Sequence, residues 1–286
     1  MSLSSWFSNN GGQSTRKFVD LIHREYAVWP NLRPEKEIRV GDYGLINKRT
    51  GEWEADGGNI YTDPATVRHS AEHPSETKPK PPAVGGHEEY ISSNVTSSDA
   101  TLGPEISIPG GSTLYATVEF KYANSAGAVI FLVEFQRTWI PDALLKVLSK
   151  DTAPHLAGKS LVTDVTSCRA CFMQLSRGVE SNIQIEFKAQ APLTVGSAGG
   201  GVRVGRHPTT TAAFEKLCNF TEDRTVSYFP LFSLKRRTNN RRWENRRSTE
   251  TSPEHDWETE DRPWMKLGKD GAELASASDT EDEDSD

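Results

Sequence analysis

The chain has 286 residues, of which 35% are hydrophobic and 26% are charged, which is enough for one large or two small domains with a hydrophobic core. Its net charge of −7 is unevenly spread, because residues 250–286 contain 14 acidic and 3 basic residues and residues 1–249 carry a net charge of +4. The longest apolar run, AGAVIFLV (126–133), has the length of a strand, so we expect no membrane-spanning helix.

The first predicted element is a helix over TRKFVDLIHREYAVW (15–29). Its apolar residues recur at helical spacing: Phe18, Val19, Ile22, Tyr26 and Trp29. The next segment, VGDYGLINKRTGEWEADGGNIYTD (40–63), predicts short strands joined by tight turns at its glycines. Residues 64–113 are poor in apolar side chains, and PSETKPKPPAVGG (74–86) contains four prolines, so we expect a long loop there.

The strongest strand signals are TLYATVEFKY (113–122) and GAVIFLVEFQRTW (127–139). They flank a turn that contains Asn124, Ser125 and Gly127, which is typical of a β-hairpin. The sequence then predicts further elements in the order helix, strand, strand and flexible hairpin tip: PDALLKVLSK (141–150), SLVTDVTSCRACFMQLS (160–176), SNIQIEFKAQAPLTVG (181–196) and GSAGGGVRVG (196–205).

A last helix is expected over TTAAFEKLCNF (210–220), with Phe214, Leu217 and Cys218 on its inner face. After SYFPLFSL the composition becomes strongly charged, so we expect the edge of the domain near residues 232–236. The order helix, strands, helix, strands, helix and tail predicts an α+β fold.

The residues that usually signal catalysis are absent from the sequence as motifs. We find no Gly-x-Ser-x-Gly elbow, no P-loop and no His-Glu-x-x-His, so we expect a protein that is not an enzyme and needs no cofactor. Cys168 and Cys171 have the spacing of half a zinc site, but they lie in a predicted strand and Cys218 stands alone, which favours buried packing. Three cysteines and a first segment without the apolar stretch of a secretory signal favour the cytosol.

The basic run KRRTNNRRWENRR (235–247) has seven positive charges and one negative charge, and the chain ends in the acidic SASDTEDEDSD. Taken alone, the basic run fits a disordered linker, a nuclear import signal or a nucleic-acid-binding surface. Because neither a stacking nor a groove-reading module accompanies it, we expect no nucleic-acid partner. A nuclear or nucleic-acid-associated adaptor stays open as the alternative function, and a soluble scaffold is a third hypothesis.

Four features together resemble the pore-forming domain of gasdermins, above all the short gasdermin-like proteins of fungi and bacteria. They are the first helix, the GDYGLI…TG…GNIY segment, the PDALL helix and the LVTDV strand, and the similarity covers residues 15–230. The resemblance implies a twisted, mostly antiparallel sheet with surrounding helices, followed by a short acidic tail that is disordered or partly helical. It implies three parts: a pore-forming domain (1–234), a basic protease-accessible linker (235–249) and an acidic inhibitory tail (250–286).

The function that the resemblance implies is regulated cell death by an autoinhibited pore former. A subtilisin-like or caspase-like protease would remove the C-terminal part of the cytoplasmic protein. The freed domain would then bind acidic phospholipids of the plasma membrane, namely phosphatidylserine, cardiolipin or phosphoinositides, and form a homo-oligomeric transmembrane β-barrel from hairpins in 64–120 and 181–204. In fungi, such proteins are tied to heterokaryon incompatibility.

The resemblance also implies roles for individual residues. Lipid contact is expected, by position, at Arg16, Lys17, Arg24, Lys48 and Arg49, although the same charges also suit an ordinary soluble surface. The expected cleavage region consists of Phe232, Ser233, Leu234, Lys235, Arg236 and Arg237. The tail residues expected to dock on the domain are Trp257, Trp264, Met265 and Leu267.

Overall fold

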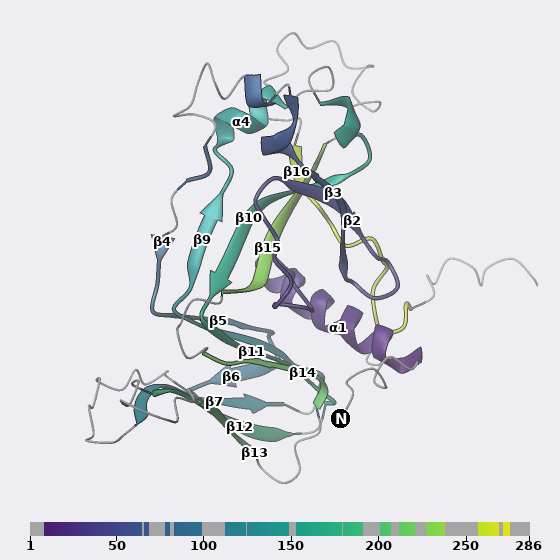
Figure 1. The fold of residues 1–286 in the computed structure, drawn as a ribbon. Helices are drawn as coiled ribbons and strands as arrows, with labels where there is room; N and C mark the ends of the chain where they lie inside the picture. The colour runs from purple at the N-terminus through teal and green to yellow at the C-terminus, as the bar shows by residue number, and fades with distance from the viewer. Residues whose placement is uncertain are drawn as a thin grey trace, which may run out of the picture.

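The computed structural model describes residues 9–64, 66–68, 78–80, 83–98, 112–123, 125–148, 153–178, 180–190, 201–206, 212–220, 227–237, 257–268 and 271–274. Over these residues the protein is α+β, as the order of elements predicted. Antiparallel strands form three sheets, and one long helix lies beside them (Figure 1). The helices labelled in Figure 1 are α1 (Asn9–Tyr26) and α4 (Asp142–Val147), with short 3-10 turns at Ile60–Thr62 and Pro154–Leu156, and residues 64 and 66–68 are also helical.

The largest sheet, sheet A, joins strands from both ends of the described chain. Its strand order is β1-β15-β10-β2-β3, with β9 paired to β10 and β4, and β16 paired to β15. The strands of sheet A are β1 (Trp29–Pro30), β2 (Asp42–Ile46), β3 (Trp53–Asn59), β4 (Ala83–Val84), β9 (Gln136–Trp139), β10 (Ser160–Cys168), β15 (Tyr228–Arg237) and β16 (Trp257–Thr259).

Two four-stranded sheets lie below sheet A in the view of Figure 1. Sheet B has the order β14-β11-β8-β5, and sheet C has the order β13-β12-β7-β6. The strands of sheet B are β5 (His87–Ile91), β8 (Ala128–Val133), β11 (Ala170–Ser176) and β14 (Ala212–Cys218). The strands of sheet C are β6 (Val95–Ser97), β7 (Ser112–Tyr122), β12 (Ser181–Gln190) and β13 (Gly201–Arg206).

Sheet B is covered on both faces. In β8, alternate residues from Ala128 to Leu132 belong to a core shared with α1 and sheet A, and alternate residues from Val129 to Val133 belong to a second core shared with sheet C. All residues of β8 are buried. This position explains the uninterrupted apolar run in the sequence, because a strand with two covered faces does not need to alternate.

One long strand pair bends from sheet B into sheet A. β8 ends and β9 begins around Glu134, which has a φ of 51°, and β10 gives way to β11 at the same level. The antiparallel register is the same on both sides of the bend, from Asp164 opposite Trp139 to Leu175 opposite Ala128. This ladder fixes the orientation of sheet A on sheet B, since its strands belong to both.

The strands predicted over 113–122 and 127–139 are present, but the hairpin expected between them is wrong. β7 pairs with β6 and β12 in sheet C, whereas β8 pairs with β5 and β11 in sheet B. The connection between β7 and β8 therefore carries the chain from one sheet to the facing sheet. The physical reason is that Val118, Phe120 and Tyr122 bury their side chains in the core between sheets B and C.

The helix expected over 210–220 is also wrong. Residues Ala212–Cys218 form β14, which pairs with β11 and places Cys218 opposite Cys171. The segment is rich in helix-forming residues, but pairing along β11 overrides that propensity. Its burial also depends on tertiary contact, because the Phe214 ring packs on the Phe18 ring of α1 with 4.9 Å between centroids.

The long loop expected over 64–113 contains strands β4, β5 and β6 and the start of β7. β5 lies at one edge of sheet B, and Tyr90 is the buried residue of this strand. Low apolar content is typical of an edge strand, so composition alone did not reveal it. The expected hairpin tip at 196–205 likewise contains part of β13, which pairs with β12.

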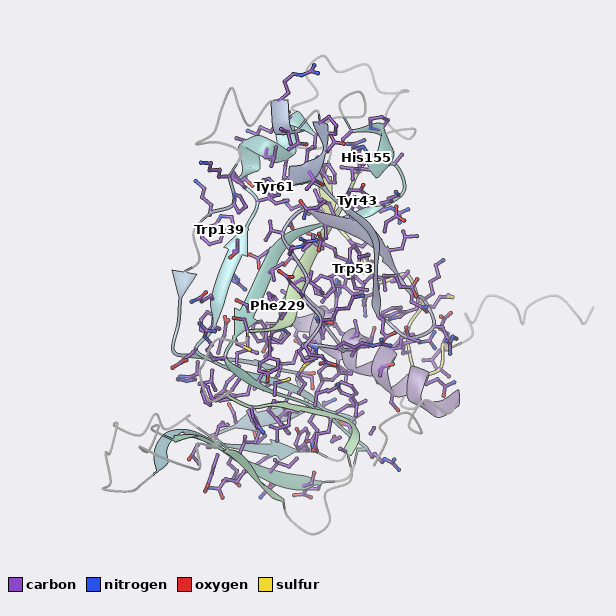
Figure 2. The ribbon with its side chains drawn as sticks, in the orientation of Figure 1. Tyr43, Trp53, Tyr61, Trp139, His155 and Phe229 are labelled. Atoms are coloured by element: carbon purple, nitrogen blue, oxygen red, sulfur yellow. The ribbon has the colours of Figure 1, made fainter. Side chains whose placement is uncertain are left out.

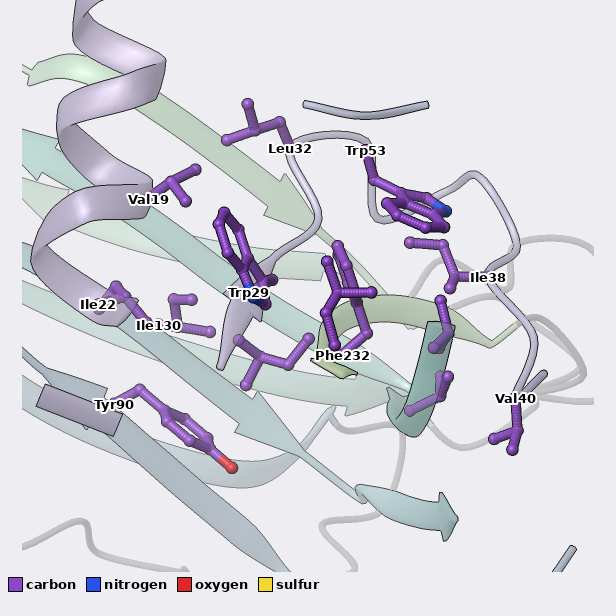
Figure 3. Packing of buried hydrophobic residues seen from close by; sticks show 14 of the residues in the cluster. Val19, Ile22, Trp29, Leu32, Ile38, Val40, Trp53, Tyr90, Ile130 and Phe232 are labelled. Carbon is purple, nitrogen blue, oxygen red and sulfur yellow. The ribbon is translucent and has the colours of Figure 1, made fainter. Parts of the chain in front are cut away.

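The two other expected helices are confirmed with shifted ends. α1 begins at Asn9 and ends at Tyr26, and α4 occupies the middle of the expected segment 141–150. Trp29 was expected on the helix but lies in β1, opposite Phe232 of β15. Figure 3 shows its ring between α1 and Phe232, and the side chain is fully buried. The chain therefore turns from helix to sheet within three residues.

The acidic tail, expected to be disordered or partly helical, contributes a short strand within the described residues. β16 extends sheet A, and Leu267 forms an isolated bridge with Glu273. Of the expected tail 250–286, residues 257–259 are thus part of the sheet, and residues 250–256, 269–270 and 275–286 lie outside the described residues.

Aromatic side chains close the end of sheet A that lies away from α1. Tyr43 and His155 face each other there (Figure 2), with 5.2 Å between ring centroids. The hydroxyl of Tyr43 lies so close to Gly58 that a Cβ atom on Gly58 would be 1.9 Å from it. A larger residue at this position of β3 would therefore have to displace the Tyr43 ring.

The end of α1 generates a prediction. Ala27 follows the helix with a φ of 55°, is exposed, and donates its N–H to the carbonyl of His23 at 2.8 Å. A left-handed residue after a helix favours glycine by about 1 kcal/mol. We expect Ala27→Gly to raise the free energy of unfolding in urea by about 1 kcal/mol. The matched control, Ala143→Gly inside α4, should lower it by a similar amount, about 1 kcal/mol. A loss of stability in both variants would contradict the left-handed helix end.

Candidate functional site

The most informative surface is the one where the C-terminal segment, defined here as residues 257–268 and 271–274, lies on the rest of the protein. Its first residues form β16, which pairs antiparallel with the end of β15 from Arg237–Trp257 to Lys235–Thr259. The segment, drawn in yellow in Figure 1, then continues along helix α1.

The C-terminal segment runs antiparallel to α1 along one face of the helix. The contacted helix residues are spaced by three or four positions, which places them in one stripe. In order along the segment, the contacts are His23 with Glu260, Asp20 with Arg262 and Trp264, Lys17 with Leu267, and Arg16 with Gly271 and Glu273.

Asp20 is the central residue of this contact. Its carboxylate is fully buried and accepts hydrogen bonds from Arg24 at 2.7 Å and from Arg262 at 2.5 Å. The indole N–H of Trp264 donates to the same carboxylate at 3.2 Å. Two of the three donors to this buried charge therefore come from the C-terminal segment, and charged hydrogen bonds of this kind are the strong ones.

Apolar side chains of the segment fill the space around these polar contacts. Trp264 and Leu267 are 8% and 4% exposed, and the Trp264 ring packs edge-on to Trp29 with 6.1 Å between centroids. Trp257 donates its N–H to the carbonyl of Leu145 at 3.0 Å. Three of the four residues expected to dock thus contact the body of the protein.

The fourth expected residue, Met265, is 55% exposed, which contradicts its expected place in the contact. It follows directly after Trp264, which is 8% exposed. Met265 is therefore a natural control position next to a docked residue.

Two titratable groups lie inside the contact. Burial lowers the pKa of His23, whose Nε2 is 3.2 Å from the carbonyl oxygen of Glu260 and whose ring packs on Trp29. The folded protein therefore favours the neutral imidazole, and protonation of His23 as the pH falls lowers the free energy of unfolding. Burial raises the pKa of Glu260, with the Arg236 charge opposing the shift, so protonation of Glu260 acts in the opposite direction.

Two of the five cations expected to bind lipid are held by the C-terminal segment. Arg16 donates to the carbonyl of Gly271 at 2.7 Å and forms an ion pair with Glu273 at 3.1 Å. Lys17 is 8% exposed and donates to the carbonyl of Leu267 at 3.4 Å. Neither ammonium nor guanidinium group is available to a membrane surface in this state.

The other three expected cations are more accessible. Lys48 and Arg49 are exposed on the turn between β2 and β3, and Arg24 pairs with Asp20 while its side chain remains 45% exposed. The fold joins the turn to the helix, because Arg16 donates to the carbonyl of Lys48 at 3.3 Å and Thr15 donates to that of Thr50 at 3.0 Å. Cations from two separate sequence segments thus share one surface.

The expected cleavage region does not lie in an exposed linker. Residues Phe232 to Arg237 belong to β15, between β10 and the pair β1 and β16, and the expected domain boundary at residue 234 falls inside this strand. Phe232 and Leu234 are fully buried, and Arg237 is 8% exposed and donates to the carbonyl of Leu148 at 2.8 Å. A protease cannot bind these residues in the folded sheet. The prediction that this region is accessible to a protease is therefore wrong for residues 232–237. Residues 238–256, which include the rest of the basic run, lie outside the described residues.

Sequence reasoning missed Asp20, Arg262 and Gly271. In the sequence Asp20 falls on the charged face of the helix, opposite Phe18 and Ile22, where nothing distinguishes a buried carboxylate from a solvated one. Gly271 has a φ of 85°, and a Cβ there would lie 2.3 Å from the carbonyl oxygen of Gln13. No pattern in the sequence distinguishes this glycine from the 21 others.

The cysteines pack in the core as expected. Cys168, Cys171 and Cys218 are buried free thiols, and the hydrogen bond to Cys171, together with burial, raises the pKa of Cys218. Among the residues that the structure describes, no group of histidine, cysteine and acidic side chains is arranged to hold a metal ion.

The chain matches no protein-family model, and no curated protein matches it. Within the described part of the chain, none of the helices combines the length and the apolar character needed to cross a membrane.

The buried ion pair generates a prediction about coupling between Asp20 and Arg262. Because removing one partner of a buried pair strands the other, we expect Asp20→Asn and Arg262→Gln each to lower the free energy of unfolding by about 3 kcal/mol. In the double variant the losses should not add, with a coupling of about 2 kcal/mol in a urea-unfolding cycle. The matched control is Lys266→Gln, which removes an exposed charge of the same segment and whose effect should stay below about 0.5 kcal/mol. Additive losses would contradict the pairing.

The close approach of Gly271 to α1 generates a second prediction. Gly271→Ala should destabilise the protein by left-handed strain and by the clash with Gln13, and it should speed hydrogen exchange at the Leu274 N–H, which donates to Lys266 at 2.9 Å. Gly57→Ala is the matched control, since Gly57 has a φ of 79° and open space around its Cβ position. We expect Gly271→Ala to cost about 2 kcal/mol more than the control. Equal losses would show that the segment does not lie against the helix.

Proposed function

We propose that this protein is an autoinhibited pore former of the gasdermin type, in which the C-terminal segment covers the membrane-binding face of α1 until the chain is cut. The observation that supports this proposal is the contact of Arg16 and Lys17 with main-chain carbonyls of the segment. These are two of the cations to which the resemblance assigns lipid contact. The fold is of the α+β, antiparallel class that the resemblance implies.

Release of the segment changes the charge of the surface in two ways. Arg16 and Lys17 become available next to Lys48 and Arg49, and each cation near an anionic leaflet contributes about 1 kcal/mol. The two released cations correspond to an increase in membrane affinity of about 30-fold. A cut before Glu250 also removes a net charge of −11, which repels the same leaflet.

The activating cut belongs in residues 238–256. The peptide bonds of β15 are shielded by neighbouring strands, and the next described residue after Arg237 is Trp257. A subtilisin-like or caspase-like protease acting in this stretch separates the segment from the body without breaking a described strand. The cytoplasmic protein then moves to the plasma membrane, where copies assemble into a pore and the cell dies, as in fungal heterokaryon incompatibility.

The alternative, a nuclear or nucleic-acid-associated adaptor, has less support. It relies on the seven cations of 235–247, but Lys235, Arg236 and Arg237 are residues of β15. Arg237 donates to main-chain carbonyls inside the protein, and Arg236 pairs with Glu260 at 3.4 Å. These two side chains are committed to the fold and are not free to contact phosphates.

Dye release from liposomes tests the proposal. A site for a sequence-specific protease is inserted within residues 238–256 of the full chain, and leakage is measured before and after cutting. We expect leakage only after the cut, and only from vesicles that contain phosphatidylserine or cardiolipin in phosphatidylcholine. In the cut protein, Lys48→Ala with Arg49→Ala should lower vesicle binding by about 30-fold, which corresponds to about 2 kcal/mol.

The matched control for these charges is Lys146→Ala on α4, which lies at the other end of sheet A and should leave vesicle binding unchanged. Leakage from uncut protein would keep the pore and reject the segment as its inhibitor. No leakage from cut, folded protein on acidic vesicles would reject pore formation.

A further inference from the structure

The surface that receives the C-terminal segment has the features of a peptide-binding site. It offers a strand edge, a buried carboxylate and two cations, in an order that matches the segment. β15 accepts β16 by main-chain pairing, which is the mode known as strand addition. The Asp20 carboxylate then accepts hydrogen bonds from the Arg262 guanidinium and the Trp264 indole. Arg16 and Lys17 donate to main-chain carbonyl oxygens of the segment.

The recognition is complementary in charge as well as in shape. Along the described contact, Arg236 meets Glu260, Asp20 meets Arg262, and Arg16 meets Glu273. The sign of the charge on the segment thus alternates over these three pairs, and a shift by two residues that moved Arg262 to the place of Glu260 would set it against Arg236. Such a pattern identifies a particular sequence, independently of the chain that connects it.

The chain that connects β15 to the segment is long enough for the segment to come from the same molecule or from a second copy of the protein. Residues 238–256 are 19 residues, which can span up to about 65 Å when extended. All described contacts between segment and body are non-covalent, so a cut in this stretch removes the tether and none of the contacts.

We infer that, once its own segment is cut, this surface binds the C-terminal segment of a second copy of the chain. The biological meaning of the inference rests on the proposed function. A segment bound in this way again covers the membrane-binding face of α1 in a protein that has been cut. Cutting alone then does not open the protein. It lowers the local concentration of the segment from the millimolar range of a tethered peptide to its concentration in solution. Opening therefore depends on dilution or removal of the cut segment.

The test is an exchange experiment in solution without membranes. The full chain with the inserted protease site is cut after folding and mixed with an excess of fluorescein-labelled peptide of residues 257–274. Incorporation is followed by fluorescence anisotropy and gel filtration. Because excess peptide is always present, the surface need not be empty at any stage. We expect the peptide to bind the cut chain at least about 100-fold more tightly than the uncut chain, whose tethered segment competes.

Peptide variants identify the contacts. Arg262→Ala and Trp264→Ala should each weaken binding by about 30-fold or more, since each removes a donor to a buried carboxylate. The matched control, Met265→Ala, should bind within about threefold of the natural peptide because Met265 is exposed. Lack of exchange into the cut chain, or equal binding of the Arg262→Ala peptide, would overturn the inference.

The outcome separates this inference from the proposed function. Peptide exchange without leakage from any vesicle would keep the binding site and reject the pore. Leakage from the cut chain that excess peptide does not suppress, together with absent exchange, would keep the pore and reject the binding site.

Discussion

A carboxylate that water does not reach must be matched by donors from the protein, and Asp20 is such a group. Arg24 supplies one partner from the same helix, and Arg262 supplies another from 242 residues further along the chain. A buried charge that loses a partner is strongly unfavourable, so undocking of the C-terminal segment must either hydrate Asp20 or leave it to Arg24 alone. This constraint couples the first helix to the last described residues and makes the closed arrangement cooperative.

Helix α1, which carries Asp20, has two faces that contact different parts of the protein. Phe18 and Ile22 face the core that sheets A and B share, and they hold α1 in place whether or not the segment is docked. The stripe from Arg16 to His23 faces the segment. Since the bent ladder ties sheet A to sheet B, the strand that receives β16 and the helix that receives Arg262 stay in fixed positions. One segment can therefore contact both at once.

Much of the strand content and the helix α1 could be predicted from periodicity, because Phe18 and Ile22 recur at helical spacing and the apolar run 126–133 has strand length. The partners of the strands could not. Whether β7 pairs with β8 depends on which sheet buries Phe120, and β14 is a strand because β11 lies beside it. Docking by Trp264 followed from its apolar character, whereas the buried role of Asp20 required knowing that Arg262 lies next to it.

Arg16 and Lys17 contact the C-terminal segment through its main-chain carbonyls, at Gly271 and Leu267. These contacts do not involve the exposed side chains of the segment, and residues such as Met265 and Lys266 carry no packing constraint. Substitutions can therefore accumulate on the outer face of the segment without loss of closure. Over evolutionary time, the sequence of that face is free to change, while the face toward α1 stays the same.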